Sequence, residues 1–231
     1  MKTFVVSMLL LSPAALSAQV GERRADLAIG VNGGVALNQV SFNPTVKQTL
    51  HRGATMGVTV RYTCEKYFSS ICAVQAELNY ARLGWEEVIE TSSDTYRRDV
   101  DFLQLPIFAR MAWGREQRGF QFFVMAGPEF DFYLGDSDQR GGEWSSATLA
   151  ERPNNITAQY DLPIQNKLEY GITGGAGLEL STAIGHFQLE GRYCFSLSDM
   201  FNNGKKDAFG RSANGAIIIK AAYLIDLMKT K

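Results

Sequence analysis

Eight segments of this chain alternate between positions without charge and positions that include charge. They are residues 27–37, 54–62, 72–80, 103–113, 120–132, 168–180, 187–195 and 217–225. The 46 positions in phase with the segment ends hold no Asp, Glu, Lys or Arg, whereas ten of the 38 interleaved positions are charged. An apolar strand face backed by a polar one is typical of a barrel that meets lipid outside and encloses polar groups. The pattern predicts an all-β protein, an eight-stranded antiparallel up-and-down transmembrane β-barrel.

The connections between these segments alternate in length. Residues 38–53, 81–102, 133–167 and 196–216 are long and polar, and residues 63–71, 114–119 and 181–186 are short. Long loops outside and short periplasmic turns are typical of outer-membrane barrels, and an even strand number then leaves both termini in the periplasm. Pro106 and Pro128 lie inside predicted strands, where each removes a hydrogen bond, so we expect a bulge or local irregularity at both.

The N-terminus has the pattern of a secretory signal peptide. Met1-Lys2 is followed by an uncharged stretch, residues 3–16, and then by the small residues Ser17 and Ala18. This stretch is too short to span a bilayer of about 30 Å, so it favours a cleaved signal over an anchor. We expect cleavage after Ala18, which leaves an outer-membrane β-barrel domain at residues 19–231.

The charged interleaved positions form the candidate site, because their parity places them inside the barrel. Six are acidic and four are basic: Glu77, Glu129, Asp131, Glu169, Glu179, Glu190, Arg61, Arg110, Arg192 and Lys220. An eight-stranded barrel is just wide enough for side chains to fill it, and unpaired buried charges are costly. The near balance of sign predicts an ion-pair network that plugs the barrel. A gated polar path or a small-molecule pocket is the alternative.

Cys64 and Cys72 flank the first short turn symmetrically about Phe68 and share outward parity. In a regular hairpin they could face each other, and the periplasm is oxidising, so a disulfide is one hypothesis. Two unbonded residues at the rim are the other, since cross-strand geometry is often strained. Cys194 has inward parity and is expected to be a free, buried thiol.

Several function classes are disfavoured by composition and motifs. The formal net charge is −1 without a basic stripe, which argues against nucleic acid as a partner. His51 and His186 are the chain's two histidines, and their spacing suits no metal site. No G-x-S-x-G motif or dinucleotide-binding glycine pattern is present, so we expect no enzyme, metal or cofactor.

Four short segments carry a family resemblance. Residues 102–108 (Phe-Leu-Gln-Leu-Pro-Ile-Phe), 74–80 (Val-Gln-Ala-Glu-Leu-Asn-Tyr), 126–129 (Ala-Gly-Pro-Glu) and 171–179 (Gly-Ile-Thr-Gly-Gly-Ala-Gly-Leu-Glu) resemble strands of the PorT-like outer-membrane β-barrel family of Bacteroidota. The resemblance implies an eight-stranded outer-membrane barrel, and some members of the family are linked to protein secretion. The chain departs from many such barrels because it does not end on an aromatic residue.

The expected function is that of a non-enzymatic outer-membrane barrel. Its contacts would be outer-membrane lipid and, through the loop at 133–167 with Trp144, other envelope or secretion proteins. Two alternatives are an accessory component of a protein secretion system and, less favoured, an outer-membrane enzyme.

Overall fold

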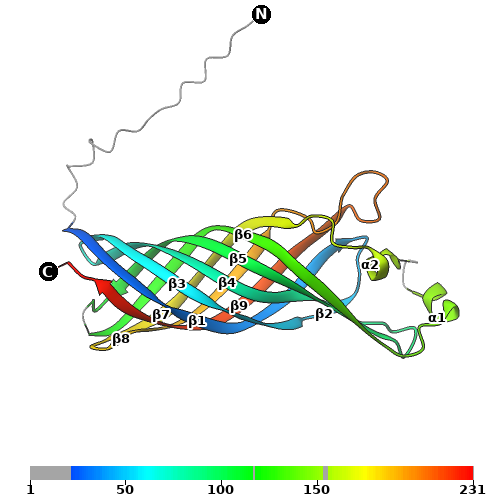
Figure 1. Ribbon diagram of the computed structural model, residues 1–231, viewed down its shortest axis with the longest axis horizontal. Helices are drawn as coiled ribbons and strands as arrows, with labels where there is room; N and C mark the ends of the chain where they lie inside the picture. The colour runs from blue at the N-terminus through cyan, green and yellow to red at the C-terminus, as the bar shows by residue number, and fades with distance from the viewer. Residues whose placement is uncertain (1–21, 117, 153–155, 231) are drawn as a thin grey trace, which may run out of the picture.

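The computed structural model describes residues 22–116, 118–152 and 156–230 (Figure 1). The predicted signal peptide, residues 1–18, lies outside these described residues. Most of these residues belong to β-strands. The two short helices, α1 (Ser146–Ala150) and α2 (Ala158–Asp161), lie in the connection between β6 and β7. Neither is long and apolar enough to cross a membrane.

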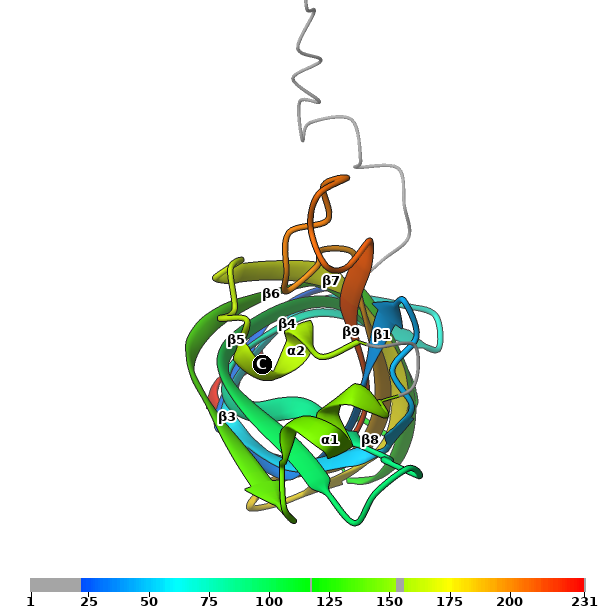
Figure 2. The same cartoon turned by 90° about the vertical axis from the view of Figure 1, so that its right-hand side faces the viewer.

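Eight long strands form a closed ring. They are β1 (Glu22–Asn43), β3 (His51–Tyr67), β4 (Ser70–Glu87), β5 (Thr95–Gly114), β6 (Gly119–Gly141), β7 (Leu168–Thr182), β8 (Gly185–Ser196) and β9 (Arg211–Met228). Each pairs antiparallel with the next, and β9 pairs with β1, so that the ring closes (Figures 1 and 2). The short β2 (Gln48–Thr49) lies beside the outer end of β4. The predicted eight-stranded up-and-down barrel is confirmed.

The two faces of the strands lie as the alternation predicted. On the outside, Val31 is 61% exposed and Leu189 is 57% exposed. On the inside, Glu77 is 3% exposed and Arg110 is 2% exposed. A soluble barrel with an apolar core would show the reverse distribution. The apolar side chains therefore form the outer wall, and the charged ones face the interior.

Several strands continue well beyond the predicted segments at the long-loop end. Residues 95–102 and 133–141 were expected to be loop, but they belong to β5 and β6. Their outer ends stay paired, because polar side chains join neighbouring strands there. Arg82 Nε lies 2.9 Å from Asp101 Oδ1, and Arg98 Nη2 lies 2.7 Å from Asp136 Oδ2. The predicted long loop 133–167 is thus partly strand, and its remainder holds α1 and α2.

The two strand prolines do not cause bulges. Around Pro106 and Pro128 a few pairs are missing from the β5–β6 ladder, between Pro106↔Glu129 and Ala109↔Ala126, but the register is the same on both sides. Gly127 lies in this gap, where the backbones approach closely: an added Cβ would lie 1.9 Å from the carbonyl oxygen of Ile107. The expected irregularity is therefore a local gap in the ladder beside a glycine, and the predicted bulge is wrong.

An aromatic cluster fills the outer end of the barrel, which the charge pattern did not predict. Inward-facing residues here include Phe42 on β1, Trp85 on β4 and Tyr96 on β5, all buried. Phe201 and Phe209, from the connection between β8 and β9, fold in against them, with ring centroids of Phe42 and Phe209 5.0 Å apart. Viewed from this end, α2 lies over the mouth of the barrel (Figure 2).

Candidate functional site: the barrel interior and its outer end

The group of interior charges nearest the short-turn end of the barrel centres on Glu179 of β7. Arg61 of β3 and Arg110 of β5 each donate to its Oε2, at 2.5 and 2.6 Å, and Gln188 of β8 donates to the same oxygen at 2.7 Å. The Arg110 guanidinium also lies 4.2 Å from the ring centroid of Phe123. The two arginine contacts cross the lumen, because β3 and β5 are not neighbours of β7 in the ring, whereas Gln188 lies beside Glu179 on the adjacent β8.

A second group lies further along the barrel around Glu77 of β4. Its Oε2 accepts hydrogen bonds from Arg192 of β8 at 3.0 Å and Lys220 of β9 at 2.9 Å. Gln75 and Asn79, the next inward residues on β4, donate to Glu77 at 2.9 Å each. Glu190 lies at the edge of this group, with Oε1 3.7 Å from Arg192 Nη1. Seven of the ten predicted interior charges thus belong to these two groups, and all seven are buried.

The other three, Glu129, Asp131 and Glu169, are buried without a basic partner. No Lys, Arg or His of the described chain lies within salt-bridge distance of them. Neutral groups contact them instead: Gln104 and Thr173 donate to Glu129 at 2.8 and 2.6 Å. The structure therefore places all ten residues inside, but it divides them into a paired set and an unpaired acidic set. The predicted ion-pair network therefore includes seven of the ten charges and not Glu129, Asp131 and Glu169.

Cys64 and Cys72 are free thiols in the structure, so the disulfide hypothesis is not supported. The register shifts between Thr63 and Glu65, and Glu65 is the residue opposite Cys72. Cys64 Sγ instead donates to the carbonyl oxygen of Cys72 at 3.3 Å. The symmetric spacing about Phe68 assumed a regular hairpin, and the irregularity removes the facing pair. Cys194 is free and buried.

Polar contacts fasten the segment that carries α1 and α2 to the outer ends of β4 and β5. Asp94 accepts hydrogen bonds from Arg152 Nη2 at 2.7 Å and from the backbone N–H groups of Glu143 and Trp144 at 2.9 and 3.2 Å. Burial alone would raise the pKa of Asp94, but these donors outweigh it and hold that pKa well below its usual range. Arg98 Nη1 donates to the carbonyl oxygen of Leu162 at 2.9 Å.

Aromatic stacking completes this attachment. The Tyr160 hydroxyl donates to Glu87 Oε2 at 2.8 Å, and its ring lies 4.9 Å from that of Trp144. Burial raises the pKa of both Tyr160 and Glu87 above the usual values. The parity pattern missed Asp94, Arg98 and Arg152. One weak signal could have predicted that β5 continues: apolar and polar residues still alternate in part through residues 95–102. Charged residues occur on both faces of this segment, so it did not fit the charge pattern.

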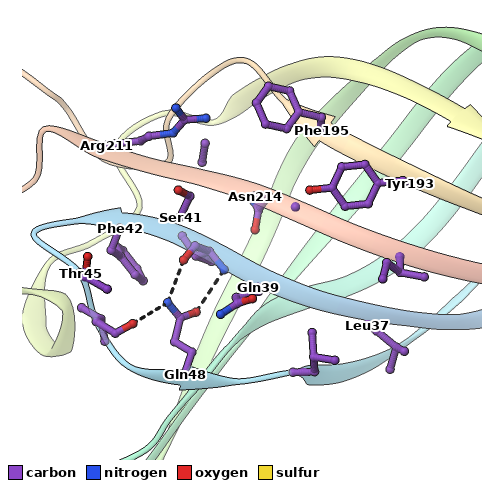
Figure 3. Close-up of a pocket in the computed structure, with 16 residues that line it drawn as sticks. Leu37, Gln39, Ser41, Phe42, Thr45, Gln48, Tyr193, Phe195, Arg211 and Asn214 are labelled. Carbon is purple, nitrogen blue, oxygen red and sulfur yellow. Dashed lines mark hydrogen bonds between the residues drawn. The ribbon is translucent and has the colours of Figure 1, made fainter.

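A groove of about 440 Å³ lies on the outside of the barrel wall, between β1, β8, β9 and the segment that leads to β2 (Figure 3). The Gln48 side chain holds this segment to β1, since its Nε2 donates to the carbonyl oxygen of Val40 at 2.8 Å and its Oε1 accepts from the Val40 N–H at 3.1 Å. Aromatic and aliphatic side chains line the groove together with polar ones, among them Tyr193, Ile217 and Arg211. Such a lining suits an amphipathic molecule.

Comparison with known proteins identifies the family. Residues 17–202 match the family described as outer membrane protein beta-barrel domain. The chain belongs to this family. Membership places the protein in the outer membrane, but it does not single out the PorT-like group among outer-membrane barrels. No match was found among curated proteins.

Solved structures similar to the chain are also outer-membrane proteins. OprG from Pseudomonas aeruginosa is 14% identical, with a TM-score of 0.49 over 89% of this chain and 98% of that one. Ail from Yersinia pestis is 15% identical, with a TM-score of 0.38 over 88% and 99%. The outer membrane enzyme PagL is 12% identical, with a TM-score of 0.42 over 85% and 97%.

Proposed function

We propose that this protein is a closed, non-enzymatic outer-membrane barrel that presents a fixed external surface to another envelope protein. The observation that carries the proposal is the attachment of the α1–α2 segment to the barrel through Asp94, Arg152 and Arg98. A surface that is already ordered loses less conformational entropy when it binds a partner. Trp144 and its polar neighbours supply the contact surface.

Closure of the barrel is supported by its filled interior. The Glu179 group, the Glu77 group and the aromatic cluster occupy successive levels along the axis. Each level joins side chains from strands on different sides of the ring, so a solute would have to break buried ion pairs or displace packed rings. The wild-type barrel should therefore conduct no ions in a planar bilayer.

The same proposal includes the orientation and the lipid contacts. Residues 1–18 direct export in a Gram-negative cell, both termini face the periplasm, and the long loops face outward. β1 begins and β9 ends at the same end of the barrel (Figure 1), which is consistent with this arrangement. Outer-membrane lipid covers the apolar wall and enters the amphipathic groove beside Tyr193 and Arg211.

A pull-down with a loop-replaced variant tests partner binding. Tyr133 N donates to the carbonyl oxygen of Lys167 at 2.9 Å, so a short Gly-Ser linker can join these positions when residues 134–166 are removed. We expect the intact protein to retain an envelope protein that the variant loses, while both keep the heat-modifiable gel mobility of a folded barrel. Removal of residues 203–208, in the connection between β8 and β9, is the matched control. Equal capture by all three proteins would contradict the proposal.

A role in protein secretion is the alternative, favoured by the four segments that resemble the PorT-like family. Deleting the gene and measuring secreted proteins separates the two. Unchanged secretion, together with loss of the captured envelope protein, favours the first function. A secretion defect favours the alternative.

A further inference from the structure

The three unpaired acidic residues lie close to a buried thiol. Glu129 and Asp131 are two residues apart on β6, so both point inward, and Cys194 reaches the same place from β8. One ligand atom from each, two carboxylate oxygens and the sulfur, all lie within 4.8 Å of one another. β7 runs between them, and its inward residues at this place are small: Gly171 is paired with Glu129, and Thr173, whose hydroxyl donates to Glu129, is paired with Cys194.

We propose that Glu129, Asp131 and Cys194 bind one divalent cation inside the barrel, and that zinc fits this ligand set best. Tetrahedral zinc with bonds of about 2.0–2.3 Å needs its ligand atoms roughly 3–4 Å apart, so small side-chain rotations close the site. Glu169, paired with Asp131 across β6 and β7, is the nearest further carboxylate.

Two carboxylate oxygens of the unpaired acidic set are buried without a hydrogen-bond partner. Asp131 is 5% exposed, yet its Oδ1 has no hydrogen-bond partner in the described chain. The same holds for Oε1 of Glu169, which is 1% exposed. Other buried interior atoms also lack partners, among them both oxygens of Glu190, but Glu190 lies beside Arg192, whereas Asp131 and Glu169 have no basic neighbour. A bound ion is one explanation for such an oxygen. A cation would satisfy Asp131 Oδ1 directly.

The charge of the site leads to the same conclusion. Elsewhere in the described interior each buried acid is next to an Arg or Lys, but no basic group contacts Glu129, Asp131 or Glu169. Neighbouring buried carboxylates cannot all remain ionised without a counter-charge. A bound divalent cation supplies that charge, whereas protonation of Asp131 is the competing solution.

The ligand chemistry selects among cations. A thiolate with carboxylates suits zinc, whereas magnesium and calcium prefer six or more oxygen ligands. Cys194 Sγ donates to Glu129 Oε1 at 3.3 Å in the metal-free site. When zinc binds, the S–H bond breaks, a Zn–S bond forms and one proton leaves to solvent. Gln104 and Thr173, which donate to Glu129, would then hold the ligating carboxylate in place.

The test is metal binding by the full-length mature barrel refolded in detergent with zinc sulfate and then washed. We expect one zinc per folded chain and a higher unfolding temperature than for the metal-free barrel. With cobalt in place of zinc, we expect a thiolate-to-cobalt charge-transfer absorption. Cys194→Ser should abolish this absorption and weaken binding at least tenfold, while Cys72→Ser, the control thiol variant, should leave both unchanged.

Asp131→Asn distinguishes the cation from the proton. If the site binds zinc, the unfolding temperature of this variant should not rise when zinc is added. Without zinc, the variant should be at least as stable as the wild type, because Asn carries no buried negative charge. No zinc in the folded wild type would overturn the proposal, and so would Cys194→Ser and Asp131→Asn variants that retain as much zinc as the wild type. The first outcome is readable from the wild type, with Cys72→Ser as its control, even if both site variants fail to fold.

Discussion

At the scale of single residues, Glu179 holds together the interior charges nearest the short-turn end of the barrel. Arg61 and Arg110 both donate to one of its oxygens, and all three side chains are buried. Removing one member of a buried ion pair leaves an uncompensated charge, which destabilises by about 3–5 kcal/mol. We expect Glu179→Gln to lower the free energy of unfolding by about this amount, measured by urea denaturation of the refolded barrel.

Glu116 provides the matched control, because it also contacts two bases, Arg24 and Lys66, but at the short-turn rim. These pairs are only partly buried, and water reaches them, so Glu116→Gln should lower the stability by about 1 kcal/mol or less. Equal losses for Glu179→Gln and Glu116→Gln would show that burial of the Glu179 group does not matter.

His51 gives the outer end of the barrel a dependence on pH. It begins β3, beyond the lipid-facing segment 54–62, and its Nε2 lies 2.6 Å from Asp99 Oδ1. Burial lowers the pKa of His51 below its usual 6.5 and Arg97 adds to this, although Asp99 opposes them. The folded protein therefore binds fewer protons at His51 than the unfolded chain does.

The sign of the effect follows from this difference. The stability from neutral His51 is fully present above the unfolded pKa of about 6.5 and decreases as the pH falls below it. We expect the urea midpoint to drop between about pH 8 and about pH 5.5, and His51→Gln to remove part of that drop. An identical pH dependence in the variant would rule out His51 as the titrating group.

At the scale of elements, one buried ion pair attaches α1, in the connection between β6 and β7, to the barrel. Arg152 joins Asp94 at 2.7 Å, and both side chains are buried. Arg152→Ala should release α1, so limited proteolysis between residues 143 and 162 should become roughly tenfold faster, as expected for losing about 1.4 kcal/mol of local stability. Arg140→Ala is the comparison variant: Arg140 also reaches this segment, through the carbonyl oxygen of Tyr160 at 2.7 Å, but its carboxylate partners Asp138 and Asp161 are exposed, so we expect a smaller acceleration. Comparable acceleration in both variants would contradict a special role for Arg152.

All eight barrel strands were predictable from sequence, but their outer ends were not. The prediction relied on contrast between an uncharged and a charged face, and lipid imposes that contrast only within the membrane. Beyond it, Arg97, Asp99 and Asp101 put charge on the outward-parity side of β5 and Arg98 puts charge on the inward side, so neither side is free of charge although the strand continues. The irregularity beside Cys64 was equally hidden, because one inserted residue changes the register without changing composition.

At the scale of the whole molecule, parity shows which side chains are inside but not which ones meet. Arg61 and Glu179 are 118 residues apart and lie on strands that do not pair. Their meeting depends on strand tilt and stagger, which set the height of each residue along the axis and are not written in any one segment. For the same reason the separation into paired charges and an unpaired acidic set near Cys194 could not be predicted from sign alone.

The successive filled levels also determine what a single interior substitution can do. Arg110→Leu removes one donor to Glu179, so stability should fall by about 2 kcal/mol. No ion path should open, because Arg61 still holds Glu179 and the Glu77 group and the aromatic cluster fill the barrel beyond it. Planar-bilayer recordings of the wild type and of Arg110→Leu, with a water-filled porin as positive control, should both show a closed barrel. Stable channels of nanosiemens size in the variant alone would mean that the Glu179 group is the only barrier, and channels in the wild type would mean that the interior is a gated path.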